Sequence, residues 1–197
     1  MKHPFYRCAA AAFVATALFA GPAAAEEDHI APIKELAATK VAVWTASPIL
    51  VDAVNAQNAA NAAITQGDID KMDKTWRAEI KSGGGPMSQK ILANALSAYL
   101  KKVKSESAGL YSEIFVMDNK GLNVGQSDPT SDFWQGDEAK WQKTYSAGPK
   151  AVHIGKVKTD ESSQTLQSQL SMSIVDPANG KVIGSVTIGV NVEQLVE

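Results

Sequence analysis

Hydrophobic residues recur at intervals of three and four through the first half of the chain, which is the spacing of one face of a helix. The alanine-rich stretch 30–64 follows this spacing, but Ser47-Pro48 falls inside it, and proline is tolerated only in the first turn of a helix. We therefore expect a long N-terminal helix that breaks or bends there. Two shorter amphipathic helices are predicted over 68–81 and 86–108, before Gly109.

The loop between these two helices is Ser82-Gly83-Gly84-Gly85-Pro86. A glycine loop in front of a helix can offer backbone N–H groups to a phosphate. This loop lacks the lysine and the hydroxyl residue of a P-loop, and no predicted strand precedes it. We interpret it as a linker.

From about residue 110 hydrophobic and polar residues alternate, which predicts strands. Turn-forming sequences at 118–121 and 176–180 join neighbouring strands as hairpins. Five strands joined mainly by tight turns favour an antiparallel sheet, and the helical first half must cover its apolar face, so the fold class is α+β. The strands are expected at 113–118, 122–126, 152–158, 166–174 and 182–191.

An irregular, aromatic and acidic segment, 128–145, interrupts the strands. The last two strands carry small polar residues on one face, so we expect this segment to fold over that face and to leave a ligand pocket below it. Aromatic rings beside carboxylates suit a small polar ligand, although the rings could instead be core residues and the carboxylates could cap turns. The predicted ligand-binding residues are Asp132, Trp134, Trp141, Tyr145, His153, Asp160, Gln169 and Ser171.

The first 25 residues have the features of a secretory signal peptide. Basic residues precede an apolar run at 8–20 that is too short to span a bilayer, and small residues follow at Ala23-Ala24-Ala25. Cleavage near Ala25 is expected to release the mature chain into the periplasm or outside the cell. The only cysteine, Cys8, lies in this leader, so disulfides are not expected in the mature protein, and no second apolar run is long enough to span a membrane.

Charge and motif content argue against several classes of function. The formal net charge is −2 and no basic stripe is present, so nucleic acid is not an expected partner. His153 has no histidine or cysteine near it in the sequence, and no metal site is predicted. No cofactor-binding loop or nucleophile motif occurs, so we expect neither a cofactor nor enzymatic activity.

Four elements of the sequence, taken in order, are typical of one family. They are VMDNKG at 116–121, TSDFWQGDE at 130–138 with Trp141, DES at 160–162 and GKVIG at 180–184. Together with the long N-terminal helix they resemble Cache domains, the PAS-like extracytoplasmic sensor modules of bacterial receptors that are also called PDC sensors. The resemblance implies a five-stranded antiparallel PAS-like sheet with the long helix and further helices packed on one face, and a ligand pocket on the other.

The resemblance further implies one domain after the signal peptide of residues 1–25, with 26–112 as its helical part and 113–197 as its sheet. Such domains bind small metabolites such as amino acids, carboxylates or amines, and they sense for histidine kinases and chemoreceptors. No transmembrane helix or output domain follows Val190, so we expect a free-standing periplasmic form that passes its state to a membrane sensor kinase or chemoreceptor. The arginine-containing motif of amino-acid-binding double Cache domains is absent, so an amino-acid ligand is not assumed.

Two other functions remain open alongside a sensor or binding module for a small polar metabolite, which would act by population shift. A small exported hydrolase could bring together His153, Ser171 and an aspartate, because triads form in space and not in sequence. A periplasmic adaptor without a ligand would instead expose Trp134 and Trp141 as an apolar docking patch.

Overall fold

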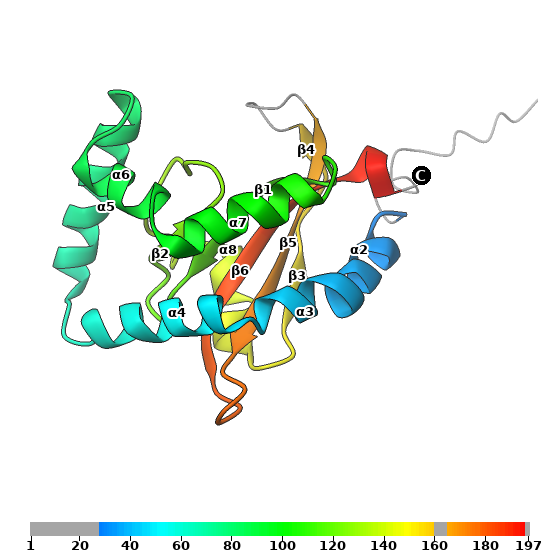
Figure 1. Cartoon of the computed structure of the whole chain (residues 1–197), viewed down its shortest axis with the longest axis horizontal. Helices are drawn as coiled ribbons and strands as arrows, with labels where there is room; N and C mark the ends of the chain where they lie inside the picture. Colours follow the sequence, from blue (N-terminus) through cyan, green and yellow to red (C-terminus); the bar gives the residue numbers. More distant parts are fainter. Residues whose placement is uncertain (1–27, 160–164, 196–197) are drawn as a thin grey trace, which may run out of the picture.

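An antiparallel sheet forms the centre of the protein in the computed structural model, which describes residues 28–159 and 165–195 (Figure 1). The strand order is β2-β1-β6-β5-β3, and β4 pairs with β5 off this path. The expected α+β class and antiparallel sheet are confirmed. The strands are β1 (Tyr111–Met117), β2 (Asn123–Gln126), β3 (Val152–Ile154), β4 (Lys158–Thr159), β5 (Leu166–Val175) and β6 (Val182–Asn191).

Two elements that were predicted to be continuous are each divided in the structure. The single strand expected at 152–158 is divided, because the chain leaves the ladder after Gly155, whose N–H still donates to the Gln169 carbonyl at 2.8 Å. The helix expected at 86–108 is also divided, because Asn94 begins a new helix by accepting a hydrogen bond from the Ser97 N–H at 2.7 Å. A capping side chain inside a helical pattern thus marks the division.

The N-terminal helical stretch bends by 73° between Ile30–Thr45 and Pro48–Ala60, which confirms the break predicted at Ser47-Pro48. The first arm also contains a π-helical turn, which the sequence did not predict. The helices are α2 (Ile30–Leu36), the π-helix η1 (Ala37–Val41), α3 (Ala42–Thr45), α4 (Pro48–Ala60), α5 (Gln66–Lys81), α6 (Pro86–Leu92), α7 (Ala95–Glu106), α8 (Ala139–Gln142), and the 3-10 helices η2 (Tyr145–Ala147) and η3 (Val192–Leu195).

Within residues 28–159 and 165–195, no single helix combines the length and apolar composition that crossing a membrane requires. The bent pair Ile30–Thr45 and Pro48–Ala60 meets these two criteria only when its arms are taken together.

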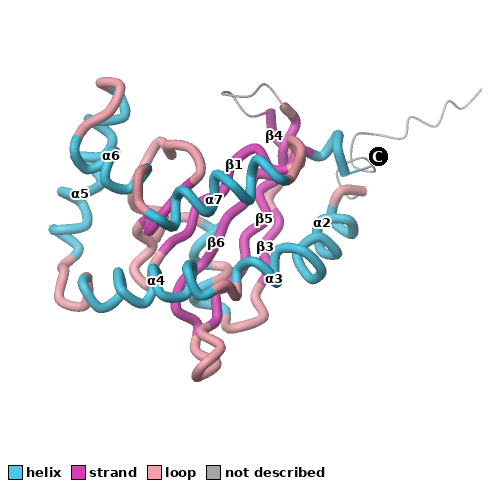
Figure 2. The backbone as a smooth tube through the Cα atoms, viewed as in Figure 1, coloured by secondary structure: helices cyan, strands magenta, loops and turns pink. Residues whose placement is uncertain are grey.

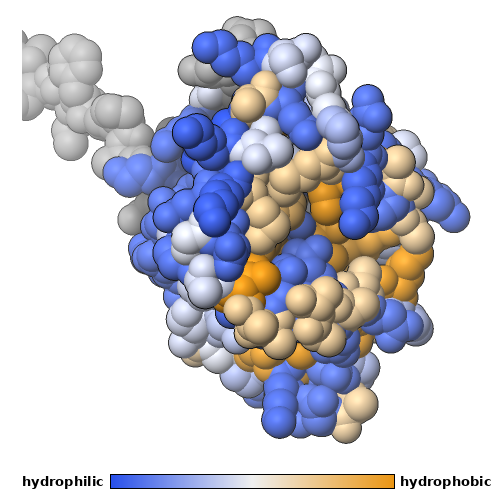
Figure 3. Space-filling model, turned by 90° about the vertical axis from the view of Figure 1, so that its left-hand side faces the viewer, coloured by the Kyte–Doolittle hydropathy of each residue, from blue (hydrophilic) through white to orange (hydrophobic). Residues whose placement is uncertain are grey.

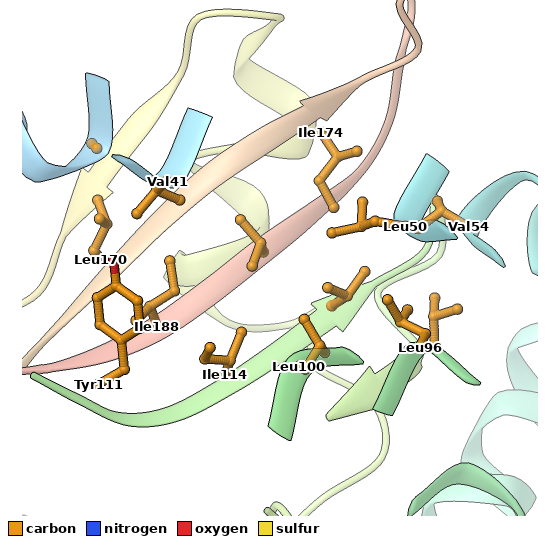
Figure 4. Close-up of a cluster of buried hydrophobic side chains, with 14 of the residues drawn as sticks. Val41, Leu50, Val54, Leu96, Leu100, Tyr111, Ile114, Leu170, Ile174 and Ile188 are labelled. Atoms are coloured by element: carbon orange, nitrogen blue, oxygen red, sulfur yellow. The ribbon is translucent and has the colours of Figure 1, made fainter. Parts of the chain in front are cut away.

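The main hydrophobic core lies between the sheet and the helices on one of its faces. Figure 2 shows α4 and α7 crossing in front of the strands, and Figure 4 shows side chains from these helices meeting side chains of the sheet. Leu50 and Leu100 are fully buried there, as is Ile188 on the central strand β6. Burying each such side chain contributes about 1.5–3 kcal/mol, and this face holds the larger of the two hydrophobic clusters in the described residues.

A second hydrophobic cluster joins α5 to the edge of the sheet through the buried residues Ile69, Trp76, Leu122 and Phe133, and Met87 and Ile91 of α6 pack against it. Figure 3 looks onto this end of the molecule, where hydrophobic groups surround a hollow with a more hydrophilic floor. The glycine linker ends where the Glu79 carboxylate accepts hydrogen bonds from the N–H groups of Met87 (3.1 Å) and Ser88 (2.7 Å). These N–H groups are the donors that a phosphate would need, so the structure favours the linker interpretation.

Candidate functional site

A pocket of about 660 Å³ lies between the sheet and the segment that contains α8. Figure 1 shows α8 behind the sheet, whereas α4 and α7 lie in front of it, so the pocket is on the face away from the main core. The pocket is lined by Glu113, Phe115, Pro129, Thr130, Ser131, Asp132, Gln135, Glu138, Ala139, Lys140, His153, Gly155, Lys156, Lys158, Thr159, Gln167 and Gln169.

The floor of the pocket is built by three strands around a glycine. Glu113 on β1 and Gln169 on β5 both pair with Gly189 on β6 between them. Because position 189 has no side chain, the Gln169 Nε2 reaches across β6 and donates to Glu113 Oε1 at 3.0 Å. A Cβ at position 189 would collide with the side chains of Ser112 and Gln167, so this glycine keeps the floor open.

One wall of the pocket, residues 129–135, is held from outside by α5. The Asp73 carboxylate accepts hydrogen bonds from the backbone N–H groups of Phe133 (2.8 Å) and Trp134 (3.1 Å). The Trp76 indole N–H donates to the Thr130 carbonyl at 2.9 Å. Helix α5 lines no part of the pocket, and yet it fixes the position of this wall.

The charge of Asp132 in this wall is balanced by the same helix. The Arg77 guanidinium lies 2.6 Å from the Asp73 carboxylate and 3.2 Å from the Asp132 carboxylate. Gln135 also donates to Asp132 Oδ1 at 2.8 Å. Asp132 therefore enters the pocket as a paired and oriented carboxylate, which reduces the cost of its partial burial.

Lys140 brings a positive charge into the other wall. Its side chain is 15% exposed, and its ammonium lies 5.3 Å from the centre of the Phe115 ring. The ammonium donates to Gln135 Oε1 at 3.0 Å and pairs with Glu138 at 3.0 Å. The pocket therefore offers both carboxylates and an ammonium to a ligand. Lys140 could not be predicted from the sequence, because one lysine in an acidic, irregular segment is typical of a solvated surface.

Three predicted site residues, Asp132, His153 and Gln169, line the pocket. The indole N–H groups of Trp134 and Trp141 instead donate to the carbonyls of Lys120 (2.8 Å) and Asp118 (3.0 Å). These two tryptophans attach the segment over the pocket to the turn between β1 and β2.

Tyr145 and Ser171 are not among the residues that line the pocket. Tyr145 stacks on Trp141, with ring centres 4.9 Å apart. Ser171 is buried against the Thr187 hydroxyl at 2.9 Å. The segment after α8 covers this part of the polar face, where Ser173 donates to the carbonyls of Thr144 (2.9 Å) and Gly148 (2.7 Å).

Asp160 lies outside the described residues. The ligand-binding role of the eight predicted residues stays a prediction.

The arrangement of His153 and Ser171 bears on the hydrolase alternative. The two residues are direct partners in the pairing of β3 with β5. The Ser171 hydroxyl is engaged by Thr187, and within the described ranges no hydrogen bond joins it to His153. The same ranges contain no group of three or more histidine, cysteine or acidic side chains placed to hold a metal ion.

His153 should make stability depend on pH. Burial lowers the pKa of His153 below its ordinary value, and the charge of Lys143 lowers it further. His153 therefore binds a proton more readily in the unfolded chain than in the folded protein. The contribution of neutral His153 to stability is present above about pH 6.5 and is lost as the pH falls through the lower pKa of the folded state. We expect the free energy of unfolding to fall less between about pH 7 and pH 5 in His153→Gln than in the parent protein. Urea titrations at both pH values check this, and equal losses in the two proteins would contradict it.

Comparison with known proteins finds no family model and no curated protein that matches the chain. Solved structures do match. The sensory domain of the Campylobacter jejuni chemoreceptor Tlp3 with isoleucine bound is 14% identical, with a TM-score of 0.38, over 74% of this chain and 59% of that domain. The sensor domain of the Vibrio cholerae histidine kinase DctB is 13% identical, with a TM-score of 0.36, over 88% of this chain and 60% of that one.

The Escherichia coli DcuS sensor domain is 18% identical, with a TM-score of 0.39, over 66% of this chain and 90% of that domain. The chain thus spans less than two thirds of the Tlp3 and DctB domains. These three similar structures are sensory or sensor domains, that of Tlp3 from a chemoreceptor and that of DctB from a histidine kinase.

Proposed function

We propose that this protein is a Cache-type sensor or binding module for a small polar metabolite. The observation that carries the proposal is the pocket of about 660 Å³, which falls within the range of small-molecule sites. Its lining combines the carboxylates of Glu113 and Asp132, the amides of Gln167 and Gln169, and the Lys140 ammonium. Such a lining suits an amine, a carboxylate or another small metabolite with several hydrogen-bonding groups.

The attachments of the pocket wall support a sensing role. A ligand that contacts Thr130 or Asp132 would act on a wall that is bonded to α5 through Asp73, Trp76 and Arg77. Binding would favour one position of the wall over others, and the energy available for this shift equals the difference in ligand affinity between those positions. A change in the position of the wall on ligand binding would thereby be transmitted to α5, on the outside of the molecule.

Export and a signalling partner belong to the same proposal. The predicted signal peptide of residues 1–25 lies outside the described residues, and its removal would place 26–112 and 113–197 in the periplasm as one domain. A membrane-bound sensor kinase or chemoreceptor would then read the ligand-bound state. The adaptor alternative is less favoured, because Trp134 and Trp141 are partly buried and their indole N–H groups are bonded to the protein itself.

A thermal-shift screen with small amines, carboxylates, amino acids and nucleobases tests the proposal. A ligand at a hundredfold excess over its Kd stabilises the folded state by about 2.7 kcal/mol. For a domain of this size that corresponds to a rise in Tm of about 5–10 °C. Gln169→Ala should weaken binding of the same compound by about tenfold, because it removes an amide from the floor.

Gln89→Ala is the matched control, since Gln89 is exposed on α6 and lies outside the pocket. It should leave the shift unchanged. A screen without any stabilising compound, or a Gln169→Ala variant that keeps the full shift, would count against a ligand in this pocket.

A further inference from the structure

A second hollow, of about 380 Å³, lies between the first helical arm and α7. Trp44 from α3, Tyr99 and Val103 from α7, and Leu110 before β1 form its apolar wall. All four side chains are only partly buried and pack on the outside of the main core. The hollow shares no lining residue with the pocket described above, so anything that binds here binds separately.

The π-helical turn η1 sets the position of the residues on one side of this hollow. The N–H of Ala42 bonds back to the carbonyl of Ala37, five residues earlier, so one extra residue is fitted into the turn. Lys40 lies in this turn and Trp44 follows four residues later, and both line the hollow. Single π-turns are rare in helices and occur frequently at functional sites.

The polar groups around the hollow favour an anion. Lys40 and Lys102 lie at its rim with Glu106, and the Lys102 ammonium is 3.7 Å from the Glu106 carboxylate, with both side chains well exposed. No ion pair with Lys40 occurs in the part of the chain that the structure describes. One lysine charge at the rim therefore lacks a counter-charge.

The indole N–H of Trp44 is a buried donor beside the hollow. The indole N–H of Trp44 is shielded from solvent and makes no hydrogen bond of good geometry, although the Tyr111 hydroxyl is its neighbour. Burial raises the pKa of Tyr111, against a smaller opposing effect of the Trp44 N–H, so the hydroxyl keeps its proton.

We propose that this hollow is a second binding site, for a small planar aromatic carboxylate whose ring packs on Trp44 and Tyr99 and whose carboxylate lies at Lys40 and Lys102. Aromatic walls provide most of the contact area for a flat ring. The unpaired Lys40 charge gives the rim a net positive charge that favours an anion, and the volume admits a ring with a short side chain.

Two probes with the same ring and opposite charge test the site: phenylacetate and 2-phenylethylamine. In NMR titrations of the purified protein, phenylacetate should cause saturable shifts at the Trp44 indole N–H and at the amides of Lys40 and Val103. The amine should bind about tenfold more weakly, because its charge repeats that of the rim. Lys40→Met should weaken phenylacetate about fivefold, whereas Lys34→Met, an exposed lysine of α2 outside the hollow, should not change it.

Equal binding of the two probes, an unaffected Lys40→Met variant, or the lack of a saturable shift at Trp44 would each overturn the second site. Shifts confined to Gly155 and Gln169 would also overturn it and would instead support the proposed function, because those residues line only the other pocket.

Discussion

Replacing Trp76 by alanine is expected to lower the free energy of unfolding by about 3–5 kcal/mol, the usual cost of removing a buried tryptophan. The Trp76 side chain is fully buried, and its ring centre lies 5.4 Å from that of Phe133. The change also leaves the Thr130 carbonyl without its donor, so the wall of the pocket should loosen. The loss should therefore affect the pocket as well as the fold.

Urea denaturation measures the loss of stability, and hydrogen exchange at residues 130–135 measures the loosening of the wall. Trp76→Phe keeps a ring in the cluster but cannot donate to Thr130, so we expect a smaller loss of stability with similarly faster exchange. Lys74→Ala, on the exposed side of the same helix, should change neither. A loss below about 1 kcal/mol in Trp76→Ala would contradict the role given to this side chain.

Replacing Asp118 by alanine should have an effect of similar size, about 3–5 kcal/mol, because it removes a buried carboxylate and leaves one buried and three partly buried donors without their acceptor. The Asp118 carboxylate is fully buried in the turn between β1 and β2. One oxygen accepts from the N–H groups of Lys120 (2.8 Å) and Leu122 (2.9 Å). The other accepts from the side chains of Gln57 and Asn61, both at 3.0 Å.

The β5–β6 turn provides a matched comparison. Asp176 is also buried, and it accepts hydrogen bonds from the Ala178 N–H (2.9 Å) and from the side chains of Asn55 (3.2 Å) and Asn179 (3.0 Å). Urea denaturation should show losses in Asp118→Ala and in Asp176→Ala. Only Asp118→Ala should speed hydrogen exchange across 130–141, because it loosens the turn whose backbone carbonyl at residue 118 accepts the Trp141 indole N–H. Equal exchange in the two variants would argue against that attachment.

The fold was predictable because its determinants are local. Alternation placed β1, β5 and β6, and Ser47-Pro48 placed the bend of the N-terminal helix. The sequence 118–121 placed the first hairpin turn, since an aspartate can accept hydrogen bonds from the backbone just after it. One error arose where a single side chain ended an otherwise continuous pattern, as Asn94 does between α6 and α7.

The candidate site was harder to predict because it depends on contacts between distant segments. Alternation placed Gln169 and His153 on the pocket face, and both line the pocket. No periodic pattern indicates whether an indole ring points into a cavity or binds a carbonyl. Trp134 was predicted to line the pocket, but its indole N–H donates to the Lys120 carbonyl. The role of α5 in holding the pocket wall likewise could not be predicted from the sequence, since Asp73 and Phe133 are far apart along the chain.

Gly189 has a consequence for the evolution and engineering of this protein. Its backbone is not confined to the left-handed region, so larger residues are permitted there by conformation and opposed only by the side chains around it. Ser112, Glu113 and Gln167 would have to turn aside for one additional methyl group. A single substitution at position 189 could therefore make the pocket shallower while the backbone of the sheet stays as it is.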